Sequence, residues 1–378
     1  MERCSSCILP THLPRMDVDQ HGKCRYCREA ERSRTPGTAM HKEQARSQFK
    51  AIVKRWKGKG KYDCLVPFSG GKESSYLLWA LVHQYGMRPL AFNFSNGFQH
   101  PDAVRNMEVL VDRLGVDLVV CRPSQVMIRK LMRTFLLKAG EFCTPCNMLI
   151  SATAFRLARQ NGIKAIMSGN AARTDPGLAG VSSATYYDRV YYLNVAGEIL
   201  TRADQDYYLN PSYVRSAIRR ILGTEAQVIN VLNYLQPSFQ DIHDTLESIG
   251  WTRPAGAIQH GDCVLDPVKE YLYYKKWGCT EVTGLYSLLI RNGEITRDEA
   301  LQRAMAEEHS KPPPVLPQFL SALGISDGDF QDASGKDFRD IRNCRNRLTF
   351  RCAKRIVRTV EQIRMRSVQF ARSIRRSE

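Results

Sequence analysis

The central part of the chain alternates short apolar runs with stretches of helical periodicity. Residues 62–68 form an apolar run that ends in a Gly-Gly turn, and residues 74–82 then switch to helical spacing. Later apolar runs and helical patterns alternate in the order 89–94, 102–114, 117–121, 150–160 and 165–169. Strands that alternate with helices predict an α/β fold, a doubly wound parallel sheet with both faces covered.

Composition divides the chain into four expected parts. Residues 1–38 are rich in cysteine and turns, and residues 39–180 carry the alternating pattern. Residues 181–338 are richer in Tyr and Asn and contain later helical patterns, whereas residues 339–378 form a basic helical tail. We therefore expect a small cysteine-rich unit, a sheet domain, a helical substrate-binding region and a C-terminal basic helix.

The loop after the first predicted strand carries the clearest chemistry. It reads Ser69-Gly70-Gly71-Lys72-Glu73-Ser74-Ser75 and precedes a helix. Paired glycines let the backbone approach an anion, and the amides of a helix N-terminus attract phosphate. The other interpretation is a tight turn with a polar cap. The coincidence of strand, glycines, lysine and serine pair favours phosphate binding.

This loop resembles the PP-loop of N-type ATP pyrophosphatases, whose signature is SGGxDS. The resemblance implies the adenine nucleotide α-hydrolase-like (HUP) fold, cleavage of ATP between its α and β phosphates, and adenylation of a substrate oxygen. Lys72 would stabilise the pyrophosphate, and Glu73, which occupies the position of the family's Asp, would help to bind Mg²⁺ or pyrophosphate. Further matches, which the family uses around the nucleotide, are Asn93, Phe94, Gly169, Asn170 and Asp175.

Two CxxC pairs near the start of the chain predict a metal site. Cys4 and Cys7 are followed, after 16 residues, by Cys24 and Cys27. Two such pairs supply four thiolates in the tetrahedral array of structural zinc sites, and a redox dithiol is the other interpretation.

A third pair, Cys143 and Cys146, precedes the helical pattern at 150–160, and Cys263 lies far along the chain. The placement resembles that in PP-loop enzymes that thiolate tRNA, where three such cysteines hold a [4Fe–4S] cluster with one open iron. A second zinc site with His260, a persulfide relay and ordinary buried cysteines are the other interpretations.

The whole chain is also similar to the N-acetyl sugar amidotransferases of surface-polysaccharide synthesis. The similarity covers roughly residues 1–335 and rests on the paired CxxC knuckles and on the segments 62–74, 266–278 and 293–300. It implies that ammonia from a glutaminase partner converts an acetamido group into an acetamidino group.

Charge adds little to this choice. The 378-residue chain has a net charge of +17, but its last 40 residues hold 13 Lys and Arg against 3 acids. Such a tail can contact tRNA phosphates or dock on the domain as a solvated helix. No apolar run is long enough for a membrane span and no apolar leader is present, so we expect a cytoplasmic protein with reduced thiols. A homodimer is compatible with the sequence.

These observations lead to one main hypothesis and two alternatives. The main one is an ATP- and Mg²⁺-dependent transferase with structural Zn²⁺, in which Lys72, Cys143, Cys146 and Cys263 help to replace a carbonyl oxygen by sulfur. The acceptor would be a nucleobase, a tRNA or a small molecule, and a sulfur donor would be needed. The first alternative is sugar amide transfer, and the second is a zinc-bearing nucleic-acid-binding module with a degenerate ATP fold.

Overall fold

Five parallel strands form one sheet in the computed structural model, which describes residues 2–14, 16–33, 38–170, 178, 187–254 and 261–341. The strands are β1 (Cys64–Pro67), β2 (Pro89–Phe94), β3 (Asp117–Cys121), β4 (Ala165–Ser168) and β5 (Gln227–Asn230). Their order is β3-β2-β1-β4-β5, so the chain winds outward from β1 in one direction and then in the other. The predicted doubly wound α/β fold is confirmed.

Strand residues alternate between two hydrophobic clusters, one on each face of the sheet. Leu65, Phe92 and Ile166 belong to the first cluster, whereas Val66 and Met167 belong to the second. This period of two, with both faces covered, explains why the strands read as continuous apolar runs.

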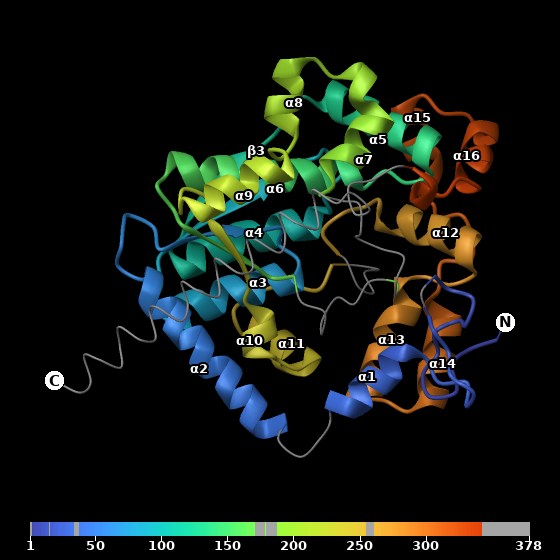
Figure 1. Ribbon diagram of the computed structural model, residues 1–378, viewed down its shortest axis with the longest axis horizontal. Coiled ribbons are helices and arrows are strands. Elements are labelled where there is room, and N and C mark those ends of the chain that lie inside the picture. The colour runs from blue at the N-terminus through green and yellow to red at the C-terminus, as the bar shows by residue number, and fades with distance from the viewer. Residues whose placement is uncertain are drawn as a thin grey trace.

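Helices cover both faces (Figure 1). The second cluster is completed by α2 (Thr38–Trp56), α3 (Lys72–Trp79), α4 (Pro101–Leu114), α10 (Leu232–Leu235) and α11 (Phe239–Ser248). A π-helical turn, Ala80–Gln84, continues α3. The first cluster is completed by α5 (Gln125–Ala139), α6 (Thr144–Gln160) and α7 (Arg189–Ala196).

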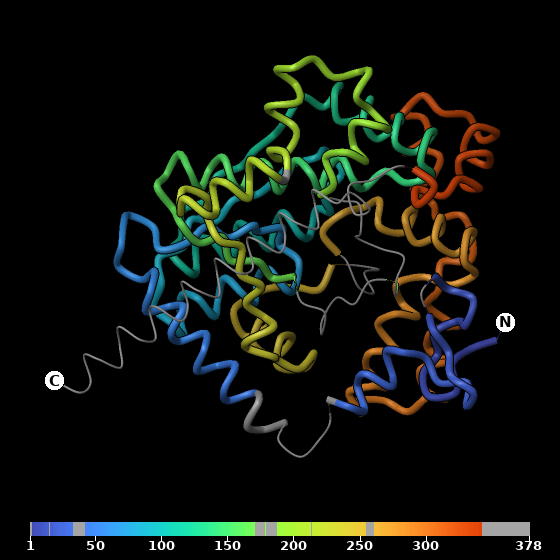
Figure 2. The backbone as a smooth tube through the Cα atoms, in the orientation of Figure 1, coloured from blue at the N-terminus to red at the C-terminus, as the bar shows by residue number. Residues whose placement is uncertain are grey.

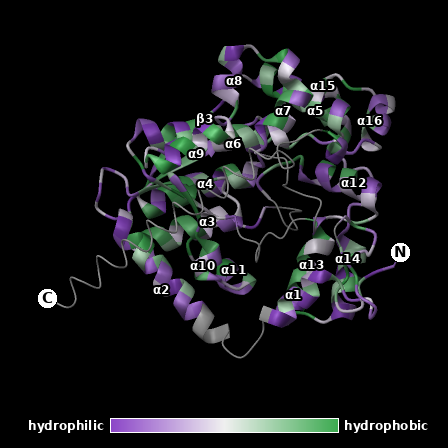
Figure 3. Ribbon diagram, in the orientation of Figure 1, coloured by the Kyte–Doolittle hydropathy of each residue, from purple (hydrophilic) through white to green (hydrophobic). Residues whose placement is uncertain are grey.

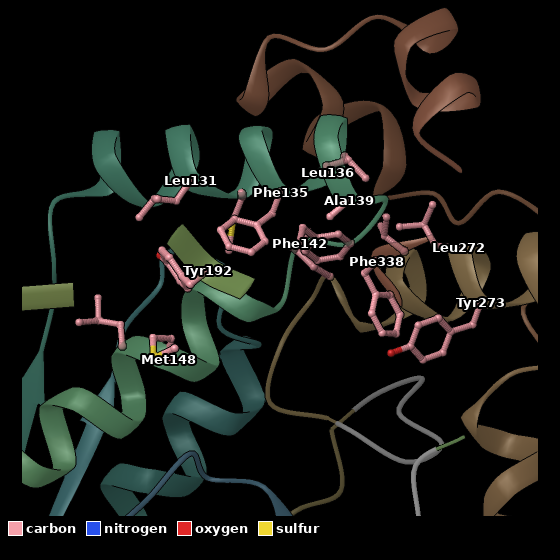
Figure 4. Packing of buried hydrophobic residues seen from close by; sticks show 14 of the residues in the cluster. Leu131, Phe135, Leu136, Ala139, Phe142, Met148, Tyr192, Leu272, Tyr273 and Phe338 are labelled. Atoms are coloured by element: carbon pink, nitrogen blue, oxygen red, sulfur yellow. The ribbon is translucent and has the colours of Figure 1, made fainter. Parts of the chain in front are cut away.

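Two elements of the sheet domain were not predicted. The edge strand β5 buries only Ile229 of its four residues, so it lacks an apolar run. The helix α5 buries one face and ends at Gly140, which adopts the left-handed conformation. Figure 4 shows Leu136 and Ala139 of α5 in the same cluster as Leu272 and Phe338, so α5 joins the sheet domain to the C-terminal helices.

The C-terminal region is helical, as expected. It contains α12 (Asp266–Trp277), α13 (Glu281–Asn292), α14 (Arg297–Glu307), α15 (Leu316–Leu323), α16 (Asp327–Ser334) and the 3₁₀ turn Phe338–Asp340. Between α7 and β5 lie the 3₁₀ turn Gly197–Ile199 and the helices α8 (Arg202–Tyr208) and α9 (Tyr213–Ile221). The tail residues 342–378 lie outside the described residues.

The cysteine-rich N-terminal segment, which ends in α1 (Arg25–Ser33), packs on the C-terminal helices. Ile8 is fully buried in a cluster with Val282 and Ala300. Arg297 donates hydrogen bonds to the carbonyl oxygens of Cys7 (3.3 Å) and Cys4 (3.4 Å). Figure 2 shows this blue segment beside the orange helices, so residues near the start and residues near 300 form one packed unit.

The hydropathy of the helices agrees with their positions on the outside of the sheet. Figure 3 shows many hydrophilic residues on the visible sides of α2 and α8. Among the helices of the described ranges, none has both the length and the apolar character needed to cross a bilayer.

Candidate functional site

A cavity of about 1060 Å³ lies at the carboxyl edge of the sheet and collects most of the predicted site residues. From the loop after β1 it is lined by Ser69, Gly71, Lys72, Glu73 and Ser74. From other elements it is lined by Phe94, Cys143, Cys146, Gly169, Asn170 and Cys263. Gly70, Ser75 and Asn93 lie outside its lining, and Asp175 lies outside the described residues.

The loop after β1 is held in one conformation by its own residues. Gly70 has φ +78°, and a Cβ atom there would lie 2.1 Å from the carbonyl oxygen of Ala103, so only glycine is tolerated. The Gly71 amide donates to Ser69 Oγ (3.3 Å), and Ser74 Oγ donates to the Gly71 carbonyl (3.1 Å). The two serine hydroxyls therefore brace the turn at the N-terminus of α3.

Lys72 and Glu73 form an ion pair at the first turn of α3. Lys72 Nζ lies 2.8 Å from Glu73 Oε1 and 5.3 Å from the centre of the Phe239 ring. The lysine side chain is only 7% exposed. A cation and a carboxylate thus lie next to each other at the cavity wall, close to the backbone amides at the N-terminus of α3, which attract anions.

A tryptophan from a distant part of the chain forms a hydrogen bond that stabilises the loop. The indole Nε1 of Trp251 donates to the carbonyl oxygen of Gly70 over 2.9 Å, and Trp251 is buried. Sequence reasoning missed this residue, because nothing in its local pattern connects it to a loop 181 positions away.

The strand ends next to the loop are tied together. Buried Asn93 donates to the carbonyl oxygen of Phe68 (3.0 Å) and accepts from Gln99 (3.1 Å). It therefore joins the ends of β1 and β2 without lining the cavity itself. A Cβ atom on Gly169 would lie 3.1 Å from the Glu73 carbonyl group. This glycine therefore lets the end of β4 approach the start of α3 closely.

The three distant cysteines face the same cavity as the loop. Cys143 is the residue before α6 and Cys146 lies in its first turn. Cys263 pairs with Gln99 in an isolated antiparallel bridge, which places it beside the segment that follows β2. The Asn96 amide donates to the sulfur atoms of Cys146 (3.7 Å) and Cys263 (3.9 Å), so one side chain joins two thiols from remote segments.

The surroundings of these half-buried thiols disfavour the thiolate. Burial raises the pKa of Cys146 and of Cys263 to about 12, and it raises the pKa of Cys143 well above its usual value despite the opposing charge of Lys269. A thiolate is the form that binds metals and attacks electrophiles. Among the described residues, only the four N-terminal cysteines have donor atoms close enough together for a single metal ion, so the three cavity thiols do not form a ready zinc site.

A carboxylate that sequence reasoning missed positions Cys143. Buried Glu141 accepts hydrogen bonds from the amides of Cys143 (2.9 Å) and Thr144 (3.1 Å) and from the Tyr191 hydroxyl (3.0 Å). Burial raises the pKa of Glu141, although these hydrogen bonds act in the opposite direction. The start of α6, and with it Cys143, is thereby fixed.

A second missed group is a charge cluster on the cavity wall around Lys269. Its ammonium lies 2.7 Å from Asp266, 2.7 Å from Glu281 and 3.2 Å from Glu270. Burial disfavours this cation, yet the carboxylates together raise the pKa of Lys269 well above its ordinary value. Acidic residues beside a cysteine, such as Asp262 and Asp266 around Cys263, were the available signal in the sequence.

The four N-terminal cysteines form a separate cluster. All four are buried and their sulfur atoms lie within 4.8 Å of one another. Cys4 and Cys27 are 4.0 Å apart and Cys7 and Cys24 are 3.9 Å apart. A tetrahedral zinc with Zn–S bonds of about 2.3 Å requires S···S distances of roughly 3.8 Å. The amides of Ser6 (3.4 Å) and Cys24 (3.3 Å) donate to Cys4 Sγ, so the donor set suits zinc.

Comparison with known proteins finds a family match in the C-terminal part of the chain. Residues 233–355 match the protein family described as LPS biosynthesis protein WbpG-like, C-terminal domain. Two similar proteins from Methanocaldococcus jannaschii are named only as uncharacterized proteins. MJ1599 is 26% identical over 267 residues, which is 70% of this chain and 79% of that protein. MJ1016 is 23% identical over 221 residues, which is 56% and 71% respectively.

A similar solved structure is the U34-tRNA thiolase NcsA from Methanococcus maripaludis with its [4Fe–4S] cluster. It aligns with a TM-score of 0.36 and 11% identity over 83% of this chain and 91% of that chain.

The family match at residues 233–355 includes Cys263 and the Lys269 cluster. The C-terminal part of the chain is thus similar to a family of lipopolysaccharide biosynthesis.

Proposed function

We propose that this protein is an ATP-dependent transferase that adenylates a carbonyl oxygen of its acceptor and then replaces that oxygen. One observation carries the proposal: the loop after β1 and three cysteines from remote segments line a single cavity. A phosphate-binding loop alone is compatible with many nucleotide-binding enzymes, and cysteines alone do not indicate any particular enzyme class. Because the loop and the cysteines line one cavity, the acceptor oxygen could be activated and then displaced at the same place.

The residues divide the work as follows. The loop amides and Lys72 bind the ATP phosphates, and Lys72 stabilises the charge of the departing pyrophosphate. Glu73 would hold Mg²⁺, which neutralises phosphate charge when it is bound. The acceptor carbonyl oxygen attacks the α-phosphorus and pyrophosphate leaves. A nucleophile then attacks the activated carbon, and AMP departs with the original oxygen.

The main candidate for the nucleophile is sulfur. Cys143, Cys146 and Cys263 would hold either a [4Fe–4S] cluster with one open iron or a second zinc, or Cys143 and Cys146 would relay a persulfide. A bound cluster would supply an iron able to carry sulfide. The Asn96 amide and Glu141 keep the sulfur atoms oriented in all of these cases.

Ammonia is the second candidate, and the family match at residues 233–355 favours it. The acceptor would then be a sugar with an acetamido group, and the product an acetamidino sugar. In that case the four N-terminal thiols would hold zinc, and the three cavity thiols would shape the acceptor site.

The decisive experiment combines metal analysis with two variants. We expect Lys72→Ala to lower acceptor-dependent pyrophosphate release on the order of a hundredfold, because it removes a group that meets developing charge. We expect Cys143→Ala to retain pyrophosphate release but to lose product, with Cys121→Ala as the control because Cys121 does not line the cavity. Pyrophosphate release at the wild-type rate in Lys72→Ala would remove the assignment of the loop.

The product and the metals then identify the nucleophile. Product heavier by the difference between sulfur and oxygen, with iron and sulfide in anaerobically purified protein, would support thiolation. Product lighter by the difference between oxygen and an NH group, with zinc as the bound metal, would support amide transfer. Wild-type product formation in Cys143→Ala would contradict the sulfur mechanism.

A further inference from the structure

Arg189 brings a positive charge to the cavity wall at the start of α7. Its guanidinium donates to the carbonyl oxygens of Asn210 (3.0 Å) and Gln205 (3.4 Å) and to the Gln205 side-chain oxygen (3.2 Å). All three acceptors are neutral, and within the described ranges no carboxylate forms an ion pair with Arg189, since Asp206 acts on it only at longer range. A guanidinium has five N–H donors, so at least two are left for a ligand.

Partial burial destabilises the charge of Arg189, and a bound anion would stabilise it. Burial lowers the pKa of Arg189, which reflects the partial loss of water around its charge. A partly desolvated cation surrounded by neutral acceptors gains strongly from an anionic partner, and the fork of a guanidinium suits phosphate.

Three other cations line the cavity wall, and each has a carboxylate nearby. Lys72 contacts Glu73, and Lys269 contacts three carboxylates. Burial raises the pKa of Glu225, whereas the charge of Arg220 acts in the opposite direction. Near Cys263, the wall adds the carboxylates of Asp262 and Asp266. An anionic group of the acceptor is therefore repelled near Cys263 and attracted at Arg189, which orients any acceptor that carries one.

The helix α6 gives the spacing between the two places. The Asn210 side chain donates to the hydroxyl of Ser151 on α6 over 2.9 Å and accepts from it over 3.3 Å. Ser151 lies five residues after Cys146 on this helix, which corresponds to about 7.5 Å along its axis. The contact that anchors Arg189 to α6, through Asn210, thus lies one to two helical turns along the helix from Cys146.

We propose that Arg189 forms an anion subsite that binds the phosphate group of a small phosphorylated acceptor and so directs the acceptor carbonyl toward the loop and the thiols. The inference rests on the proposed function, because it identifies the acceptor class of that same cavity. The volume of about 1060 Å³ supports it, since single-ligand pockets span about 300–1,000 Å³ and this cavity must admit ATP as well.

Direct binding tests the subsite without any turnover. The probes are N-acetylglucosamine 1-phosphate and N-acetylglucosamine, titrated by calorimetry into the full-length wild type, Arg189→Gln and Arg189→Lys. The control is Arg202→Met, which changes an exposed arginine on α8 that does not line the cavity. ATP binding and the melting temperature are measured for every variant.

We expect the wild type to bind the phosphorylated sugar at least tenfold more tightly than the neutral sugar. Arg189→Gln should lose this difference, Arg189→Lys should keep part of it, and ATP affinity should stay within twofold. Equal binding of the two probes by the wild type would overturn the proposal, as would an unchanged preference in Arg189→Gln. A parallel loss of ATP binding would also overturn it, because Arg189 would then belong to the nucleotide site.

The two proposals fail in different ways. A wild type that binds the sugar phosphate through Arg189 but releases no pyrophosphate would refute the proposed function and leave the subsite standing. A wild type that releases pyrophosphate in response to an uncharged acceptor would keep the function and refute the subsite.

Discussion

Single residues far from the loop decide its shape. Trp251 donates to the Gly70 carbonyl, and Gly70 holds a backbone conformation that other residues rarely adopt. If the indole is removed, a buried carbonyl loses its partner, which costs about 1–3 kcal/mol. The peptide between Gly70 and Gly71 is then free to turn away from the cavity.

We therefore expect Trp251→Phe to weaken binding of a non-hydrolysable ATP analogue about tenfold, as measured by calorimetry. Trp79→Phe is the matched control, because Trp79 lies on α3 but packs on Tyr76 rather than on the loop. Equal analogue affinity in Trp251→Phe and the wild type would show that the loop keeps its shape without the indole.

At the residue scale, local chemistry was predictable and long-range contacts were not. The sequence predicts that residues 69–75 form a loop between a strand and a helix, because glycine and helix spacing are local signals. Trp251, Glu141 and Arg189 act through contacts that depend on how distant segments pack, so no spacing rule identifies them. Their roles, like that of Lys72, stay predictions.

At the scale of elements, the N-terminus of α6 and the segment after β2 assemble the thiol site. The strands β1 to β4 and the helix α4 could be predicted from periodicity, with bounds close to those observed. The bridge between Gln99 and Cys263 could not, because one isolated pair leaves no repeating pattern. The predicted boundaries at residues 38, 180 and 338 likewise remain predictions.

The cysteine-rich segment is the element whose stability should depend on metal. We expect Cys24→Ser to lose one zinc per chain and to become sensitive to limited proteolysis within residues 1–38, because metal binding supplies the folding energy of such knuckles. The sheet should stay folded, since its second cluster contains no residue of this segment and its strands pair with one another.

The measurements are zinc content by mass spectrometry and the positions of the first cleavages, with Cys121→Ser as the control. Zinc retained at the wild-type level in Cys24→Ser would contradict the four-thiolate site. Resistance to cleavage without zinc would show that packing on α13 and α14 alone folds the segment.

At the scale of the whole molecule, one half-buried lysine joins the sheet domain to the C-terminal helices. Lys276 on α12 donates to the Gly140 carbonyl at the end of α5 over 2.6 Å. Burial lowers its pKa from 10.5 to about 8. Between pH 8 and 10.5 the unfolded chain therefore holds a proton that the folded chain has released, so this group makes stability rise with pH.

We expect Lys276→Met to remove that rise, because each pKa unit corresponds to about 1.4 kcal/mol. The free energy of unfolding by urea is measured at several values across this pH range for the wild type, Lys276→Met and the exposed neighbour Lys275→Met. The difference between the wild type and Lys276→Met should grow with pH. A constant difference would mean that Lys276 does not change its protonation on folding in this range.

The packing of the first residues on helices near residue 300 has a consequence for biosynthesis. Cys4 and its partner Arg297 are 293 residues apart, and a ribosome that adds about 5–20 residues per second needs roughly 15–60 s to cover that span. The four N-terminal thiols all emerge within the first 27 residues, long before their docking surface exists. If they bind a metal, the order of synthesis favours its capture on the nascent chain, and metal supply during translation should then affect the yield of folded protein.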